Sequence, residues 1–130
     1  MEPKWLTVEM VRALHAEGVA RFGGSAELRD GGLLESGLER ARNLHAYGDD
    51  PSLFDLAAAT CAGIVKNHPF VDGNKRAGAL AAAAFLDLNG YDFQPAEPEV
   101  VTIIMALAAG EIEEDVLARW ISDNSTAMGA

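Results

Sequence analysis

A polar run at residues 66 to 78 directly precedes a strong helix-forming segment, and this junction constrains the fold more than any other feature. The run reads Lys-Asn-His-Pro-Phe-Val-Asp-Gly-Asn-Lys-Arg-Ala-Gly, and the alanine-rich residues that follow it favour a helix. The polar side chains are therefore expected at a helix N-terminus, where unpaired N–H groups and the helix dipole favour an anion. Gly73 and Gly78 let the backbone come close to a ligand.

The side chains of this run suit phosphoryl or nucleotidyl transfer. His68 is a candidate general base because imidazole titrates near neutral pH. Asp72 is a hard oxygen ligand that suits Mg²⁺, which commonly binds one or two carboxylates together with phosphate groups. Lys75 and Arg76 can offset negative charge on the transferred group, so both are candidate catalytic residues. The candidate nucleotide-binding residues are Lys66, Gly73, Asn74, Lys75 and Arg76.

A plainer reading is that the run is a solvated polar loop that only caps a helix. Three of the ten basic residues of the chain gather in it, and apolar segments flank it on both sides. Such clustering favours a functional site over a simple loop.

The segment from His68 to Arg76 resembles the Fic motif in its death-on-curing (Doc) form, H-x-F-x-D-x-N-K-R. Other segments resemble the surroundings of that motif in Doc-type proteins, so that the likeness extends over about residues 5 to 122. They are Arg21 to Gly24, Leu28 to Leu38 and Phe85 to Tyr91. The resemblance implies the Fic/Doc fold, an all-α, compact bundle of about six helices. It also implies that ATP is the co-substrate.

Two positions depart from the Fic enzymes that transfer AMP, whose motif is H-x-F-x-D/E-G-N-G-R-x-x-R. Lys75 stands where those enzymes have their second glycine, and Ala79 stands where they have the last arginine. The Doc branch shares the lysine, and the resemblance to it implies a reversed nucleotide that presents its γ-phosphate. We therefore expect a protein kinase whose implied target is a threonine of translation elongation factor Tu, with arrested growth as the result. Two alternatives stay open: transfer of AMP or another nucleotide, and a nucleotide-binding module without turnover.

The sequence contains no Ser/Thr-x-x-x-Glu-Gly/Asn motif, the inhibitory helix that some Fic proteins carry within their own chain. Ser36, for example, is followed four places on by Arg40. The resemblance therefore implies a separate antitoxin protein. We expect part of it to fold as an amphipathic helix in a groove of this domain.

The length and composition indicate one globular domain over residues 1–130. The chain is 49% hydrophobic, which excludes general disorder. A net charge of −10 argues against direct nucleic-acid binding, which needs a basic surface. The first residues do not predict a signal peptide, and the longest apolar run, residues 77–86, is too short for a membrane span. The lone Cys61 is expected to be a buried core thiol, and a cytoplasmic location without a membrane partner follows.

Hydrophobic spacing and end signals predict helices and little else. Thr7 and Ser52 are expected N-caps, and Asn89-Gly90 is a strong stop signal for the motif helix. Residues 46–51 and 92–97 are expected to be loops, and the tail 124–130 is expected to be frayed or disordered. The expected helices cover about residues 7–22, 33–43, 52–67, 74–88, 98–109 and 113–122.

Several other residues are assigned to packing or to the surface. His15 and His45 lie within helical patterns, and each is expected on the surface or as a satisfied core residue. Trp5 and Trp120 are expected to be packing anchors near the termini. Phe70 is expected to be buried and to fix the motif loop.

Overall fold

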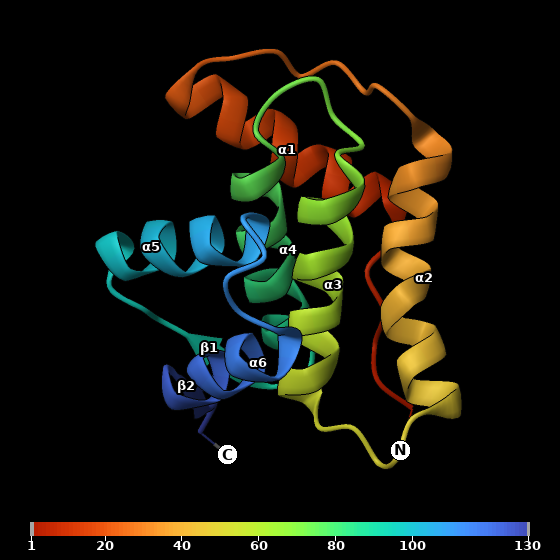
Figure 1. Cartoon of the computed structure of the whole chain (residues 1–130), viewed down its shortest axis with the longest axis vertical. Helices are drawn as coiled ribbons and strands as arrows, with labels where there is room; N and C mark the ends of the chain where they lie inside the picture. The colour runs from red at the N-terminus through yellow and green to blue at the C-terminus, as the bar shows by residue number, and fades with distance from the viewer. Residues whose placement is uncertain (1, 130) are drawn as a thin grey trace.

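The computed structural model describes residues 2–129 and shows a helical protein with one small sheet (Figure 1). Across this range the chain forms six helices and two short strands, so the all-α, six-helix expectation is confirmed apart from the strands. None of the helices in this range combines the length and the apolarity needed to cross a membrane. The elements are α1 (Val8–Phe22), α2 (Gly31–Tyr47), α3 (Leu53–Asn67), α4 (Asn74–Leu88), β1 (Tyr91–Phe93), α5 (Glu97–Ala108), α6 (Glu114–Asp123) and β2 (Ser125–Ala127).

Side-chain caps fix the starts of α1 and α3, as expected from the sequence. The hydroxyl of Thr7 accepts the N–H of Met10 at 3.2 Å. Ser52 and Asp55 form a reciprocal capping box, in which each side chain accepts the backbone N–H of the other residue. Local sequence alone therefore determines where these two helices begin.

Helix α2 is longer than the expected range of residues 33–43. Its N-cap is Asp30, whose carboxylate accepts the N–H of Leu33 at 3.1 Å, and the helix ends at Tyr47. The cap stabilises a first turn that includes Gly31 and Gly32, two residues of low helix propensity. The following loop is correspondingly shorter than expected.

Helix α3 lies at the centre of the fold, with α2, α4 and α6 packed around it (Figure 1). All residues from Leu56 to Val65 are buried. Small residues allow close packing, since a Cβ on Gly78 of α4 would lie only 2.7 Å from Val65 Cγ2. Cys61 is fully buried, as expected, and burial raises the pKa of its thiol to about 12. The two helices that carry the motif loop are thus held tightly against each other.

A two-stranded antiparallel sheet joins the segment after α4 to the C-terminal end of the described chain. The strands pair in the register Tyr91–Ala127, Asp92–Thr126 and Phe93–Ser125. This corrects the expectation of a frayed tail for Ser125–Ala127 and of a loop beginning at residue 92; residue 130 lies outside the described residues. Strands this short leave no periodic signal in the sequence, and α5 and α6 separate them along the chain.

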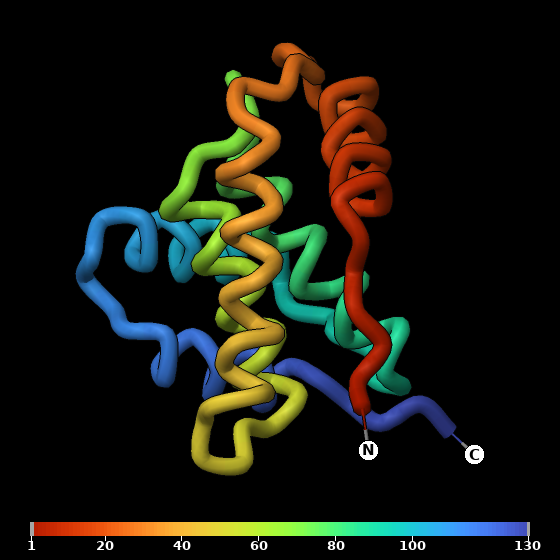
Figure 2. Tube along the Cα trace, turned by 90° about the vertical axis from the view of Figure 1, so that its right-hand side faces the viewer, coloured from red at the N-terminus to blue at the C-terminus, as the bar shows by residue number. Residues whose placement is uncertain are grey.

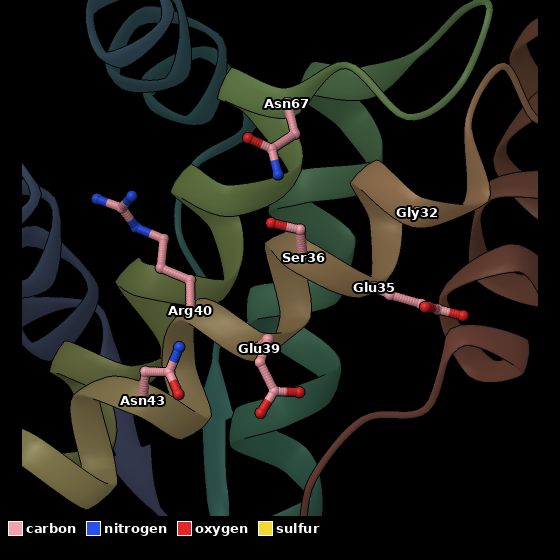
Figure 3. Close-up of a pocket in the computed structure, with 7 residues that line it drawn as sticks. All are labelled: Gly32, Glu35, Ser36, Glu39, Arg40, Asn43 and Asn67. Atoms are coloured by element: carbon pink, nitrogen blue, oxygen red, sulfur yellow. The ribbon is translucent and has the colours of Figure 1, made fainter.

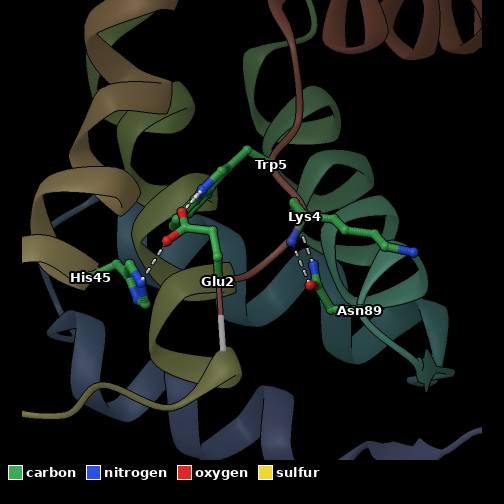
Figure 4. Close-up of polar contacts among 5 residues, drawn as sticks. All are labelled: Glu2, Lys4, Trp5, His45 and Asn89. Atoms are coloured by element: carbon green, nitrogen blue, oxygen red, sulfur yellow. Dashed lines mark hydrogen bonds and ion pairs between the residues drawn. The ribbon is translucent and has the colours of Figure 1, made fainter.

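The segment before α1 is held against α2 and the end of α4, and Figure 2 shows it running beside α2. Trp5 packs edge-on against His45 with ring centroids 5.6 Å apart, so its expected role as a packing anchor is confirmed. The carboxylate of Glu2 accepts a hydrogen bond from Trp5 and lies 3.3 Å from His45 Nε2, and Asn89 bonds both backbone groups of Lys4 (Figure 4). The hydrogen bond from Trp5 and the nearby His45 lower the pKa of Glu2.

Candidate active site

The motif residues lie in the loop that joins α3 to α4, beside α1 (Figure 1). His68 ends α3 in the left-handed region, with φ 50°, and its N–H donates to the carbonyl of Ile64 at 3.2 Å. The guanidinium of Arg29 donates to the carbonyl oxygens of His68 at 2.8 Å and of Asn67 at 3.1 Å. These contacts satisfy the last carbonyls of α3 and fix the backbone of His68, while the residue stays exposed.

Asn74, the first residue of α4, braces the motif loop from the inside. It is 7% exposed. Its Oδ1 accepts the N–H of Phe70 at 2.9 Å, and its Nδ2 donates to the carbonyl of Phe70 at 3.0 Å. The same Nδ2 lies 3.3 Å from His68 Nδ1. Because its amide forms hydrogen bonds to the loop backbone, Asn74 fixes the shape of the loop from its buried side.

The extended segment before α2 forms a wall along the same loop. The N–H of Val71 donates to the carbonyl of Glu27 at 3.1 Å. The N–H of Ser25 donates to Asp72 Oδ2 at 3.3 Å. Gly24 is needed here, because its φ is +105° and a Cβ would lie 3.3 Å from the same carboxylate oxygen. The wall therefore orients the Asp72 side chain as well as the loop backbone.

His15 of α1 is the functional-site contact that sequence reasoning missed. It is 3% exposed, its Nε2 lies 2.6 Å from the carbonyl oxygen of Asp72, and its ring stacks on Phe70 at a centroid distance of 3.7 Å. The expectation of a surface or satisfied core residue is wrong in part: His15 is buried, but its Nδ1 has no hydrogen-bond partner among the described residues. Phe70 is buried and fixes the loop, as expected.

A cleft of about 560 Å³ opens between the motif loop and the end of α1. Its opposite rim is the glycine pair after α1, with Phe22 as the largest side chain. Lys66 is exposed on the last turn of α3 and does not line the cleft, so the structure separates it from the other predicted site residues. The predicted residues that line the cleft together are His68, Asp72, Gly73, Asn74, Lys75 and Arg76.

Positive charge gathers in this cleft at the first turn of α4. Lys75 and Arg76 are exposed, and neither forms an ion pair with any residue in the range 2–129. The N-cap Gly73 supplies no side-chain hydrogen bond to the helix start. The guanidinium of Arg76 rests over Phe22, 4.5 Å from the ring centroid. Helix dipole, open N–H groups and two unpaired cations together suit a polyanion such as a nucleotide phosphate chain.

Asp72 is the residue of this cleft that could hold a metal ion. In the part of the chain that the structure describes, no three His, Cys, Asp or Glu side chains converge as a metal-binding group. The exposed carboxylate of Asp72 accepts the long hydrogen bond from Ser25 and keeps lone pairs free on both oxygens. This donor set fits Mg²⁺ that arrives with phosphate oxygens and water, and it does not fit an all-protein metal cage.

A second concavity, of about 590 Å³, lies along the exposed side of α2 (Figure 3). Its lining mixes charges, with Glu35, Glu39 and Arg40 on α2 and Asn67 at the end of α3. Arg40 is already paired with Glu114 of α6. With no histidine in its lining, this concavity lacks the candidate base and the free cations found at the motif loop, so the cleft beside α1 is the better candidate active site.

The sequence that forms the motif loop and the helices around it matches a known family. The family model described as Fic/DOC family matches residues 5–86, and the chain belongs to that family. It is 30% identical over 113 residues to "Protein kinase doc" of Escherichia phage P1, a match that covers 87% of this chain and 89% of that protein. The chain falls in the Doc branch of the family.

A second relative is a protein named "Toxin Doc" from Mycolicibacterium smegmatis. The identity is 44% over 75 residues, which cover 56% of this chain and 57% of the relative. The chain thus matches little more than half the length of that toxin.

Proposed function

We propose that this protein is the toxin of a toxin–antitoxin pair and acts as a protein kinase in the cytoplasm. It transfers the γ-phosphate of ATP to a serine or threonine hydroxyl of a translation factor, with elongation factor Tu as the expected target, and thereby arrests growth. The observation that carries the proposal is the cleft itself, where exposed His68, Asp72, Lys75 and Arg76 surround the open start of α4. The names of the two relatives, a toxin and a protein kinase, support it.

His68 serves as the general base of the proposed reaction. Its Nε2 has no hydrogen-bond partner among the described residues and takes the proton from the substrate hydroxyl. This requires the ring hydrogen on Nδ1, which would then face the Asn74 Nδ2 donor 3.3 Å away, so the ring must turn off that contact when the substrate hydroxyl binds. The freed oxygen bonds to the γ-phosphorus as the bond from phosphorus to the bridging oxygen breaks, and ADP leaves.

The other cleft residues stabilise charge. Lys75 and Arg76 offset the negative charge that develops on the transferred group and on the departing ADP. Asp72 is the residue that would hold Mg²⁺, and the ion would offset negative charge on the phosphate groups. Moving Arg76 off the Phe22 ring toward a phosphate would cost little, because an exposed cation–π contact contributes only about 0.5–1 kcal/mol.

Isotope transfer tests which phosphate moves. The purified protein is incubated with Mg²⁺, elongation factor Tu and ATP labelled at the α or the γ position, with Asp72→Ala as the inactive control. Label that reaches the target from the γ position supports the kinase. Label from the α position would establish AMP transfer instead. Retained ATP binding with no transfer of either label to this target or to a cell lysate would indicate a module without turnover.

Inhibition is proposed to come from a separate antitoxin whose disordered tail folds as a helix in a groove of this domain. Because the net charge is −10, the tail is expected to bring Arg or Lys residues to the rim of that groove. Co-expression with a small neighbouring gene should restore growth and raise the melting temperature of the toxin by mass action. If the chain alone is harmless at high expression and becomes toxic after a terminal segment is trimmed, the inhibitor is built in and this part of the proposal fails.

A further inference from the structure

His15 touches the motif loop at two points although it lies outside the motif. Its Nε2 is 2.6 Å from the carbonyl oxygen of Asp72, and its ring stacks on Phe70 with an angle of 10° between the planes. A carbonyl oxygen can only accept a hydrogen bond, so Nε2 must carry the hydrogen and donate it. His15 therefore binds the loop both through a polar contact and through its face.

The ring also lies against the turn that leads into α4. Gly73 has φ +75°, and a Cβ on it would lie 3.4 Å from His15 Nε2. The other ring nitrogen, Nδ1, is buried and has no partner among residues 2–129. An apolar side chain of similar size would avoid that unpaired nitrogen, so the hydrogen bond to Asp72 is what distinguishes histidine at this place.

Asp72 is thus held from two sides by the N-terminal part of the chain. His15 holds its backbone carbonyl, and the N–H of Ser25 holds its carboxylate oxygen Oδ2. Together they set the direction in which the free lone pairs of the carboxylate face the cleft. A ligand that is held this way keeps its geometry while the phosphates bind, which is how residues behind a metal ligand tune its affinity.

We propose that His15 is a positioning residue for the reaction: it holds the Asp72 backbone so that the carboxylate meets magnesium and the phosphates in the productive orientation. His15 acts through Asp72 and does not touch the nucleotide or the substrate. The inference rests on the proposed function, because it assigns Asp72 a role toward the nucleotide.

Two substitutions separate the two contacts of His15. His15→Phe keeps a ring that can stack on Phe70 and removes the N–H donor. His15→Gln keeps an N–H donor at the place of Nε2 and removes the ring. Val11→Ala is the matched control, since Val11 is fully buried one turn earlier on the same helix and belongs to the core.

Three readouts are compared in the full chain. Hydrogen exchange is followed at the N–H groups of Phe70 and Val71, which are bonded to Asn74 Oδ1 and to the Glu27 carbonyl. Binding of ADP is measured by calorimetry with Mg²⁺ and again with a chelator. Phosphate transfer gives kcat and KM. Neither exchange nor ADP binding requires that a phosphate be transferred, so failure of the kinase proposal would leave both readouts interpretable.

We expect His15→Phe to speed hydrogen exchange at both amides. It should also weaken Mg²⁺-dependent ADP binding by about 10–100-fold and lower kcat by a similar factor. ADP binding without Mg²⁺ should stay near the wild-type value, because Lys75 and Arg76 are unchanged. His15→Gln should recover part of the loss, and Val11→Ala should lower the melting temperature without these effects. The proposal would be overturned if His15→Phe showed the same exchange rates and the same Mg²⁺-dependent ADP binding as the wild type. It would also be overturned if Val11→Ala lost as much ADP binding and kcat as His15→Phe.

Discussion

The backbone of Gly63 in α3 lies directly against the backbone of Gly37 in α2: a Cβ on Gly63 would be 2.3 Å from the carbonyl oxygen of Gly37. Neither helix can move away easily, because α3 is buried along its length between α2, α4 and α6. The contact also matters for the site, since His68 is the C-cap of α3 and α2 follows the segment that holds the motif loop. Helix spacing in the core therefore sets the position of the candidate base.

The first prediction is that Gly63→Ala destabilises the fold. The added methyl group meets backbone atoms, which cannot rotate away, and overpacking of a core costs roughly 1–3 kcal/mol. Gly31→Ala is the control, because its Cβ would meet only Leu28 Cδ2 at an ordinary 3.5 Å. Denaturant unfolding followed by circular dichroism measures both. Equal stability of the two variants would contradict the close helix contact.

Local signals in the sequence were sufficient for most helix ends. Thr7 and Ser52 cap their helices within three residues of the groups that they bind, and Asn89-Gly90 ends α4 as expected. The motif run was likewise sufficient to predict a helix start with cations at its first turn. Such features depend on neighbours along the chain, so a single sequence contains the information.

Contacts between distant segments could not be predicted in the same way. A helix that includes Gly37 was expected, but nothing in the sequence indicates that Gly37 packs against Gly63. His15 and Asp72 are 57 residues apart, and only the packing of α1 over the loop brings them together. The pairing of β1 with β2 depends in the same way on α5 and α6. Tertiary packing decides each of these cases.

A second prediction concerns Asn74→Asp. The substitution replaces the Nδ2 donor with an oxygen that faces the carbonyl of Phe70, so two acceptors meet in a buried place. Loss of such a buried hydrogen bond costs about 1–3 kcal/mol, and more where a charge is introduced. We expect a lower melting temperature and loss of transfer activity. Asn43→Asp on the exposed side of α2 should change neither, and a fully active Asn74→Asp variant would refute the bracing role.

A third prediction follows from the buried thiol of Cys61. Burial raises its pKa from 9.0 to about 12, so in the folded state the thiol keeps its proton at pH values where the unfolded chain has lost it. The stabilising effect is complete below pH 9 and is lost as the pH rises toward 12. We expect alkylating reagents to modify Cys61 only after unfolding. Stability should also fall more steeply above pH 9 in the wild type than in Cys61→Ala. Rapid modification of the folded protein at neutral pH would contradict the burial.

The fourth prediction tests the chemistry of the cleft in living cells. His68→Ala removes the proposed base and Asp72→Ala removes the proposed metal ligand, and both side chains are exposed, so the fold should survive. Loss of a general base typically lowers the rate about 10²–10⁴-fold, which is enough to abolish growth arrest at moderate expression. His45→Ala is the control histidine, since it lies on α2 beside Trp5, away from the cleft. Growth curves after induction, with circular dichroism of each purified variant, give the result. A folded His68→Ala variant that arrests growth as strongly as the wild type would show that His68 is not the base.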